Sequence, residues 1–356
     1  MLRLVRIVVV LLVIIGVAGL SLRIPWVQDR LVRMGAKHYL AQRLDLFEGG
    51  GMRVLACGTS SPLPHRTRAR PCVAVIAGGR FYVVDTGSGS WNNLALWRMP
   101  GERIGAVFLT HFHSDHIGDL GEFNLQTWVA GRGGPLPVYG PEGVERVTAG
   151  FNEAYALDAG YRVAHHGADF LVPESAPMEA RRFTLGSDER AVILEDGGLR
   201  VTAFAVNHRP IQPAVGYRFD FGGRSVVISG DTTKYAGVAA AAKDADVLFH
   251  EAQANHLVAI IGEEAAKLGR PRVAKLMADI PSYHTSPVEA AEIANEAGVR
   301  LLVLYHLTPP PPSKLFLPAF MRGVSDVRSS GVIVADDGLI VELPAGSHEI
   351  ETTHIE

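Results

Sequence analysis

The sequence predicts a layered α/β domain that follows an apolar N-terminal segment and an amphipathic helix. Short apolar or β-branched runs alternate with segments of helical periodicity, and several of the strand-like runs end in histidine or aspartate. Such alternation is typical of sheets covered by helices. The 356 residues, of which 47% are hydrophobic, suffice for one large core and an appendage.

Residues 1–23 are predicted to be a transmembrane anchor or a signal segment. Arg3 and Arg6 precede a run without charge at positions 7–22, which is the pattern of a secretory-type segment. The poor cleavage signal favours an uncleaved anchor, although the run is short for a membrane span. Because positive charges stay in the cytoplasm, we expect a single-pass inner-membrane protein with a periplasmic or extracytoplasmic catalytic domain.

Residues 24–50 are predicted to form an amphipathic helical stalk or linker. Apolar residues recur at helical spacing over positions 25–47 among Arg30, Arg33, Lys37 and Arg43. This excess of basic residues suits contact with anionic lipid, and an ordinary helix packed on the domain is the alternative. Glycines at positions 49–51 mark the boundary of the main domain.

Within the main domain the expected elements follow in order. Strands are predicted at 52–56, 72–77, 80–85, 104–109, 136–139, 199–205, 214–221, 225–229, 247–249 and 301–305. Helices are predicted to begin at 94 and to cover 121–130, 141–155, 236–243 and 287–297. The weak periodicity of residues 161–185 indicates an irregular lid or cover. Cys57 and Cys72 have no metal-binding spacing, and two buried thiols are favoured over a disulfide across neighbouring strands.

The densest group of metal-ligand side chains is His-Phe-His-Ser-Asp-His at positions 111–116, directly after the apolar run 106–109. Imidazole and carboxylate groups at this density suit zinc or a similar first-row ion. Side chains two residues apart do not face each other on a helix, so a loop at the end of a strand is expected. The alternative is a polar loop that binds no metal. Such a loop would explain one histidine, but it explains less well why His111, His113 and His116 occur together with Asp115.

Further candidate ligands stand at the ends of other strands. His208 follows the strand at 199–205, Asp231 follows the one at 225–229, and His306 ends the one at 301–305. One histidine at a strand end is ordinary. Three such ends in a chain that also holds the motif at 111–116 predict additional metal ligands.

These motifs together resemble the metallo-β-lactamase superfamily, in its branch with ribonuclease Z, cyclic-nucleotide phosphodiesterases and some arylsulfatases. The matching segments are Thr-His-Phe-His-Ser-Asp-His-Ile-Gly at 110–118, Asn-His at 207–208, Ser-Gly-Asp-Thr at 229–232, His-Glu-Ala at 250–252, Tyr-His-Thr-Ser at 283–286 and Tyr-His at 305–306. The resemblance covers positions 52 to about 308. It implies a four-layer αββα fold and a hydrolase domain over residues 51–356.

The resemblance also implies roles for individual residues. It assigns His111, His113 and His208 to one Zn²⁺ and Asp115, His116 and His306 to a second, with Asp231 bridging them; Mn²⁺ or Fe²⁺ are alternatives. A metal-bridging hydroxide would be the nucleophile. The implied catalytic residues are Asp115, His284 as general acid and Glu251, which would orient His284. A histidine that caps the following helix is the alternative for His284, and His250 and Thr232 are expected to support the metal loops.

Two sets of residues are weaker candidates. Arg66, Arg68 and Arg70 lie in the loop after the first strand and either hold an anion or form a solvated basic loop. His165 and His166 either line a pocket or lie on the surface, and the surface is favoured.

The favoured function is the hydrolysis of anionic esters by a dinuclear zinc site, with phosphodiesters as in ribonuclease Z. The alternative is a membrane-anchored arylsulfatase-like or small phosphoester hydrolase. Transfer RNA is less favoured, because residues 167–186 are short for a clamping arm and an exported domain meets no transfer RNA. The net charge of −3 gives no general attraction for a polyanion. Redox chemistry is disfavoured because His113 replaces the glutamate of flavodiiron relatives. The sequence leaves a homodimer open.

Overall fold

The computed structural model describes residues 6–7 and 20–355 and divides the chain into two units, Met1–Arg43 and Leu44–Glu356. The first unit contains helix α2 (Pro25–Leu40), which has a proline in its first turn, where no backbone donor is needed. The helix was predicted to cover positions 25–47, but it ends at Leu40. Leu44–Phe47 is a separate 3₁₀ helix, η1, at the start of the second unit.

The predicted membrane segment, residues 1–23, falls mostly outside the described residues. Over positions 6–7 and 20–355, no helix is both long and apolar enough to cross a membrane.

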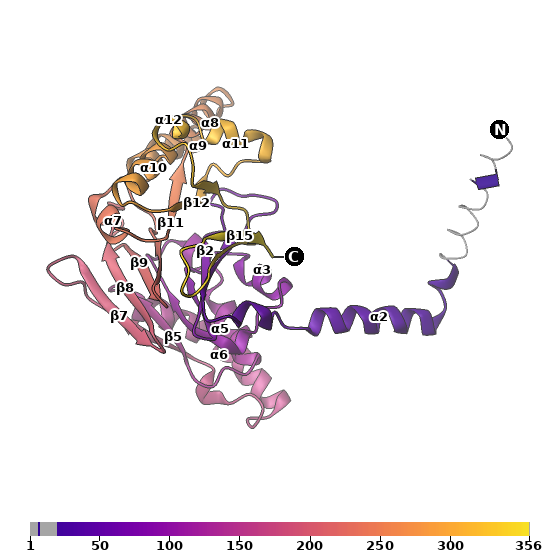
Figure 1. Ribbon diagram of the computed structural model, residues 1–356. Helices are drawn as coiled ribbons and strands as arrows, with labels where there is room; N and C mark the ends of the chain where they lie inside the picture. Colours follow the sequence, from indigo (N-terminus) through magenta and orange to yellow (C-terminus); the bar gives the residue numbers. More distant parts are fainter. Residues whose placement is uncertain (1–5, 8–19, 356) are drawn as a thin grey trace. The chain divides into compact units, whose positions relative to one another are not determined.

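Two sheets form the centre of the second unit (Figure 1). The first has eight strands in the order β15 (Glu351–His354), β14 (Leu339–Leu343), β1 (Met52–Gly58), β2 (Cys72–Ala77), β3 (Arg80–Val84), β4 (Ile104–Phe108), β5 (Leu136–Gly140) and β6 (Met178–Arg182). The second has seven strands in the order β13 (Val332–Val334), β12 (Leu301–Thr308), β11 (Val247–Gln253), β10 (Arg224–Ile228), β9 (Val215–Phe221), β8 (Leu199–Ala205) and β7 (Arg190–Asp196).

The two sheets face each other across one apolar core that includes Val54, Phe108, Tyr217 and Phe249. Helices α3 (Ser90–Leu96), α5 (Leu120–Val129) and α6 (Val144–His166) pack on the outer face of the first sheet. Helices α7 (Ala236–Ala241), α10 (Pro287–Glu296), α11 (Leu317–Phe320) and α12 (Val324–Val327) pack on the second. The predicted α/β fold with two sheets between helical layers is confirmed. Burial on both faces explains why the first five residues of β12, positions 301–305, are apolar without alternation.

Three parts of the fold differ from the sequence prediction. The supposed irregular region at 161–185 contains the end of α6 and strand β6, which pairs with β5. Only Val144 and Thr148 of α6 are fully buried, and the rest of its apolar side, such as Phe151 and Tyr155, is partly buried, which weakens the signal of its length. Strand β7 has no fully buried residue, which hides its alternation. Helices α8 (Asn255–Lys267) and α9 (Pro271–Asp279) were not predicted.

Cys57 and Cys72 form a disulfide, so the preference for two buried thiols was wrong. Strand β1 pairs with β2, and the register places Gly58 opposite Cys72. The adjacent Cys57 therefore lies 4.9 Å from Cys72 between Cα atoms, a separation within the normal range for a bridge.

Candidate metal centre

The predicted ligands converge from both sheets. The segment after β4 carries the motif at 111–116 and includes the short helix α4 (Ser114–Ile117). The segments after β8 and β10 carry His208 and Asp231, and β12 carries His306. Strands β10, β11 and β12 are parallel, so their carboxyl ends meet at one edge of the sheet. Residues from distant parts of the sequence thus come together in one cluster.

Of the three overlapping groups of potential ligand atoms, two contain the predicted ligands, and the third joins Asp231 and His306 with His284. The first group is His111, His113, His208 and Asp231, and the second is Asp115, His116 and His306. Within each group the atoms lie within 4.8 Å of one another.

The Asp231 carboxylate reaches both groups. Its Oδ2 lies 3.9 Å from Nε2 of His111 and 3.9 Å from Nε2 of His208, in the first group. The same oxygen lies 3.4 Å from Nε2 of His116 and 3.3 Å from Nε2 of His306, in the second. One carboxylate in this position can serve two ions.

The hydrogen bonding of the cluster fits a divalent metal. The buried atoms without a hydrogen-bond partner include Asp115 Oδ2, His116 Nε2, His208 Nε2, Asp231 Oδ1 and His306 Nε2. Buried polar atoms seldom lack partners, and here they gather at one place. Imidazole nitrogens and carboxylate oxygens are suitable ligands for such an ion. The donor set therefore defines a candidate divalent-metal site.

Electrostatics keep most of these groups in the form that binds metal. Burial lowers the pKa of His111 well below its ordinary value, and burial also lowers the pKa of His113 and His208, which favours neutral imidazole. Burial raises the pKa of Asp115, but His116 and His306 lower it more, to about 2. Burial likewise raises the pKa of Asp231, but His306 and His116 lower it more and hold it well below its usual range. Both carboxylates are therefore ionised at neutral pH.

Asp85 is a functional residue that the sequence analysis missed. It lies directly after β3 in a left-handed conformation with φ of 59°, and it is buried. Its Oδ2 accepts a hydrogen bond from His116 Nδ1 at 2.8 Å, and its Oδ1 accepts one from the backbone of Thr110 at 2.9 Å. This contact directs Nε2 of His116 into the cluster. The available signal was the Asp-Thr-Gly sequence at the end of a strand.

Negative charge around His116 also favours a cation. Burial lowers the pKa of His116, but Asp231, Asp85 and Asp115 outweigh burial and raise this pKa well above its ordinary value. A field that stabilises a proton at His116 likewise stabilises a metal ion beside it.

His208 is oriented by a backbone group that sequence patterns do not reveal. Its Nδ1 donates to the carbonyl oxygen of Tyr283 at 2.9 Å, which leaves Nε2 to face the cluster. This hydrogen bond joins the His208 loop to the segment that carries His284.

His284 and Glu251 form a buried pair beside the metal groups. Nδ1 of His284 donates to Glu251 Oε1 at 2.9 Å, and the same oxygen accepts from the backbone of Thr232 and Thr285. Burial lowers the pKa of His284, but Glu251 raises it more strongly, to about 9. A ring nitrogen of His284 lies within 4.8 Å of the ligand atoms of Asp231 and His306.

His284 does not cap the following helix, so that alternative was wrong. Ser286 caps α10: its side chain accepts from the backbone of Glu289, and the Glu289 side chain accepts from the backbone of Ser286.

The supporting residues behave differently from one another. Thr232 joins two loops, because its backbone donates to Glu251 and its Oγ1 accepts from the backbone of Asn207 at 3.1 Å. His250 donates through Nδ1 to the carbonyl oxygen of Glu251 at 2.7 Å and is outside the two ligand groups.

The side chains of the weaker candidates have other partners or are exposed. Arg68 donates to Thr59 Oγ1 at 2.6 Å and pairs with Asp336, so it joins two loops. Arg70 donates to the carbonyl oxygen of Pro62 at 3.0 Å, and Arg66 is exposed.

His165 and His166 are exposed in the last turn of α6, where their rings contact each other with centroids 4.7 Å apart. Neither of them belongs to the ligand groups.

Comparisons with known proteins agree with this fold and site. Residues 80–307 match the family model described as Beta-lactamase superfamily domain. Ribonuclease Z of Mycobacterium bovis (strain BCG) is 35% identical over 261 residues, which cover 72% of this chain and 86% of that protein. Ribonuclease Z of Mycolicibacterium gilvum is 36% identical over 261 residues, which cover 72% of this chain and 85% of that protein.

Solved structures show the same fold at lower sequence identity. The short form of human tRNase Z has a TM-score of 0.58 and 21% identity, over 82% of this chain and 99% of that chain. The metallo-beta-lactamase fold protein YhfI of Bacillus subtilis has a TM-score of 0.57 and 21% identity, over 82% of this chain and 100% of that chain.

The chain belongs to the metallo-β-lactamase superfamily. Within it, the chain is a metal-dependent hydrolase that acts on ester bonds and is related to ribonuclease Z. The predicted family and enzyme class are thereby confirmed.

The same comparisons correct the predicted location. The relationship to ribonuclease Z contradicts a single-pass inner-membrane protein with an extracytoplasmic domain. The argument against transfer RNA rested partly on that location and loses this support.

Proposed function

We propose that the chain is a dinuclear zinc phosphodiesterase of ribonuclease Z type that cleaves RNA. The observation that carries this proposal is the Asp231 carboxylate, which lies within 3.9 Å of histidine nitrogens in both ligand groups. A single ion would leave one of the two groups without use.

Each ligand group would hold one ion. His111, His113 and His208 would bind the first, Asp115, His116 and His306 would bind the second, and Asp231 would bind both. When bound, the two ions would lower the pKa of a shared water, the nucleophile, and withdraw charge from a phosphoryl oxygen. The buried His111, His116, Asp231 and His306 exclude bulk water from the inner side, whereas the exposed His113 marks the side open to substrate.

His284 would act as the general acid for the leaving oxygen. Glu251 raises the pKa of His284 and holds Nδ1, so Nε2 would carry the proton that is transferred. Glu251 is a positioning residue in this scheme, because it fixes the ring and stabilises its charge.

RNA is the favoured substrate because the similarity to ribonuclease Z extends over 86% of the length of the Mycobacterium bovis protein. With the predicted membrane location contradicted, transfer RNA precursors are the first RNA to test. The arylsulfatase-like alternative is not favoured.

The test is a substrate panel with the purified full chain loaded with zinc. Precursor transfer RNA, bis(p-nitrophenyl) phosphate and p-nitrophenyl sulfate are compared for wild type, His284→Ala and the control His166→Ala, an exposed histidine outside the ligand groups. We expect cleavage of RNA and of the aryl phosphate, and a loss of about 10²–10⁴-fold in kcat on RNA for His284→Ala with metal content unchanged. The loss should be smaller on the aryl phosphate, whose leaving group departs without a proton. Hydrolysis of the sulfate without cleavage of RNA would contradict the proposal.

A further inference from the structure

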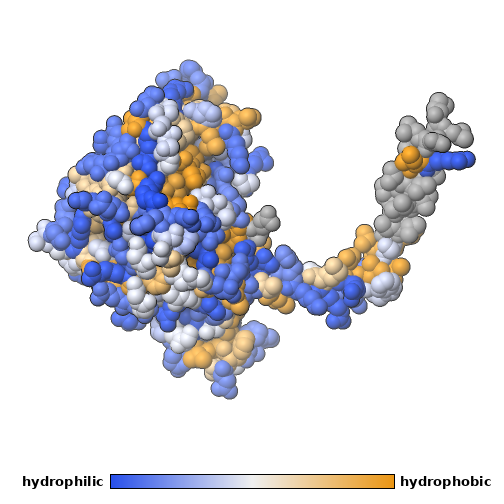
Figure 2. Space-filling view, in the orientation of Figure 1, coloured by the Kyte–Doolittle hydropathy of each residue, from blue (hydrophilic) through white to orange (hydrophobic). Residues whose placement is uncertain are grey.

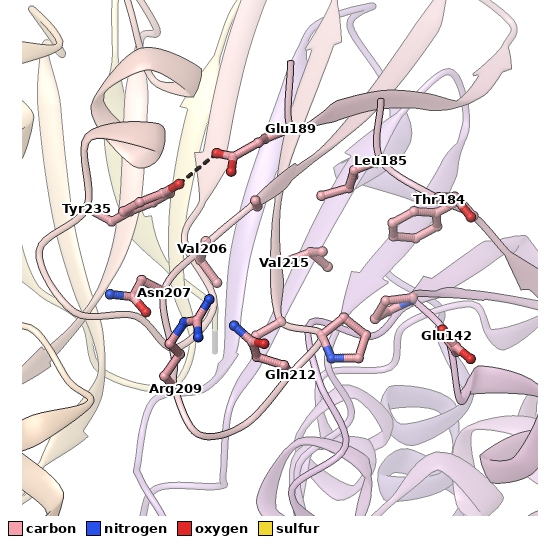
Figure 3. A pocket seen from close by; sticks show the side chains of 15 residues that line it. Glu142, Thr184, Leu185, Glu189, Val206, Asn207, Arg209, Gln212, Val215 and Tyr235 are labelled. Carbon is pink, nitrogen blue, oxygen red and sulfur yellow. Dashed lines mark hydrogen bonds between the residues drawn. The ribbon is translucent and has the colours of Figure 1, made fainter. Parts of the chain in front are cut away.

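A cavity of about 710 Å³ opens beside the His208 loop (Figure 3). This volume lies in the range of about 300–1,000 Å³ that is common for small-ligand sites. Its wall includes the segment after β6, the ends of β8 and β9, the 207–215 loop and Tyr235. None of the residues whose side chains line it belongs to the ligand groups, although His208 lies in the same loop.

Two segments next to metal ligands in the chain lie at the cavity. Asn207 and Arg209 line it, whereas His208 between them belongs to the first ligand group. On the other side it is lined by Pro141 and Glu142. These two residues precede Gly143, which lies close to Phe112. A Cβ added at Gly143 would come within 2.9 Å of the Phe112 ring.

Phe112 is in turn the neighbour of the exposed ligand His113. The cavity is therefore lined by residues next to His208 in the chain and by a segment that lies close to Phe112, beside His113.

The inner wall is apolar and includes one aromatic ring. Phe183, Leu185, Val206 and Val215 line the cavity. Phe183 packs edge-on against Tyr217, with ring centroids 6.3 Å apart, which restrains the ring. An apolar wall with a restrained aromatic side chain suits a planar base.

The polar groups at the cavity match the rest of a nucleotide. Arg209 and Gln212 extend from one loop toward the cavity in Figure 3, and within the described residues their side chains form no hydrogen bond or ion pair. Arg209 is thus available for a phosphate oxygen and Gln212 for a base edge. At the opposite end the Tyr235 hydroxyl donates to Glu189 at 2.6 Å, so this carboxylate has further acceptor capacity for a hydroxyl or amino group.

We propose that this cavity binds the unstacked nucleoside of the RNA next to the scissile phosphodiester, with Arg209 on its flanking phosphate and Phe183 against its base. This assignment rests on the proposed RNA-cleaving function and extends it to a specificity site. The cavity contributes to RNA binding without taking part in the reaction itself.

The test compares Arg209→Ala and Phe183→Leu with wild type on two substrates. Leucine at position 183 keeps an apolar side chain but removes the ring. The control is Arg200→Ala, an exposed arginine at the amino end of β8, paired with Glu195 at the protein surface. We expect kcat/KM on precursor transfer RNA to fall about tenfold or more for each cavity variant. Activity on bis(p-nitrophenyl) phosphate should stay within about twofold, because this ester has no nucleoside.

Binding gives a second measurement that does not depend on turnover. The Kd of a fluorescein-labelled single-stranded RNA, measured by anisotropy with EDTA present, should rise about tenfold for Arg209→Ala and remain unchanged for Arg200→Ala.

Cleavage of RNA by wild type with unaltered kcat/KM in both cavity variants would overturn the nucleoside site alone. An equal loss on both substrates would also overturn it, since the cavity would then serve aryl groups or the fold. No RNA cleavage by wild type would overturn the proposed function and the site with it.

Discussion

Asp85 illustrates how a residue outside the ligand groups controls the metal centre. Its carboxylate joins the strand ends of β3 and β4, because it accepts from His116 Nδ1 and from both the backbone and the hydroxyl of Thr110. The hydrogen bond fixes which nitrogen of His116 faces the metal and increases the basicity of that nitrogen.

Asp85→Asn should therefore weaken metal binding by about 10–100-fold, because an amide cannot supply the negative charge. Competition with a chromophoric chelator measures the affinity. Asp158→Asn is the matched control, since Asp158 pairs with Arg162 on the partly exposed surface of α6. Unchanged zinc affinity in a folded Asp85→Asn protein would contradict the assigned role.

Glu251→Gln is expected to separate catalysis from metal binding. The glutamine keeps the size of the buried side chain but removes the charge that holds His284 protonated. We expect kcat on RNA to fall by about 10²-fold, with KM and zinc content close to wild type. Steady-state kinetics and elemental analysis measure both quantities. A change confined to KM would show that Glu251 does not act through His284.

At the scale of elements, Arg224 and Asp246 connect β10 to the start of β11 and to the C-terminal segment. The two side chains form two hydrogen bonds, at 3.0 and 2.9 Å, and Asp246 also accepts from the backbone of Ser225. Arg224 donates further to the carbonyl oxygens of Pro344 and Ser347. The second sheet, which carries Asp231 and His306, depends on this connection.

The pair gives a pH-dependent contribution to stability. Burial raises the pKa of Asp246, but the Arg224 hydrogen bond and charge lower it more, so the folded pKa is below the unfolded value of about 3.9. The contribution is therefore present above about pH 3.9 and disappears as pH falls through the folded pKa.

Asp246→Asn should lower the free energy of unfolding by about 3 kcal/mol at pH 7, because Arg224 remains buried without its partner. Urea denaturation at pH 7 and at about pH 3.5 should show the difference from wild type shrinking in acid. Glu195→Gln, in the exposed pair with Arg200, should change stability by less than about 1 kcal/mol at either pH. A constant difference for Asp246→Asn at both pH values would contradict this account.

What the sequence revealed depends on how local each signal is. His111 to His116 form a dense motif, and His306 ends an unbroken apolar strand, so both could be recognised without a structure. The roles of Asp85 and Tyr283 depend on which strand ends and loops become neighbours, which the local sequence does not record.

The same limit applies to the arginines, but not to helices α8 and α9. The sequence does not distinguish Arg66, Arg68 and Arg70 from one another. In the structure, however, the Arg68 guanidinium is hydrogen-bonded to Thr59 and paired with Asp336. Helices α8 and α9 have only a few buried residues, Val258, Ala265 and Met277. They nevertheless carry apolar residues at helical spacing, such as Val258, Ile261 and Ala265, so the sequence held a signal that the prediction overlooked.

At the scale of the whole molecule, the proposed recognition of RNA would depend on local groups. The net charge is −3, and the face shown in Figure 2 mixes hydrophilic and hydrophobic areas. Neither property provides a general attraction for a polyanion. Arg209 beside the metal centre, with the metal charge itself, is consistent with recognition at the point of cleavage.

The metal centre also joins the two sheets, since the motif at 111–116 follows β4 of the first sheet and Asp231 and His306 belong to the second. We predict about two equivalents of zinc in wild type, about one in His208→Ala and in His306→Ala, and none in Asp231→Ala, because Asp231 reaches both groups. Elemental analysis after dialysis counts the metal, and His166→Ala should retain two equivalents.

Removal of metal by a chelator should lower the Tm, because ions that bind only the folded chain stabilise it by about 4 kcal/mol at 1,000 times their Kd. One equivalent in wild type, or an unchanged count in Asp231→Ala, would contradict the dinuclear arrangement, whereas a Tm insensitive to chelation would contradict only the connection between the sheets.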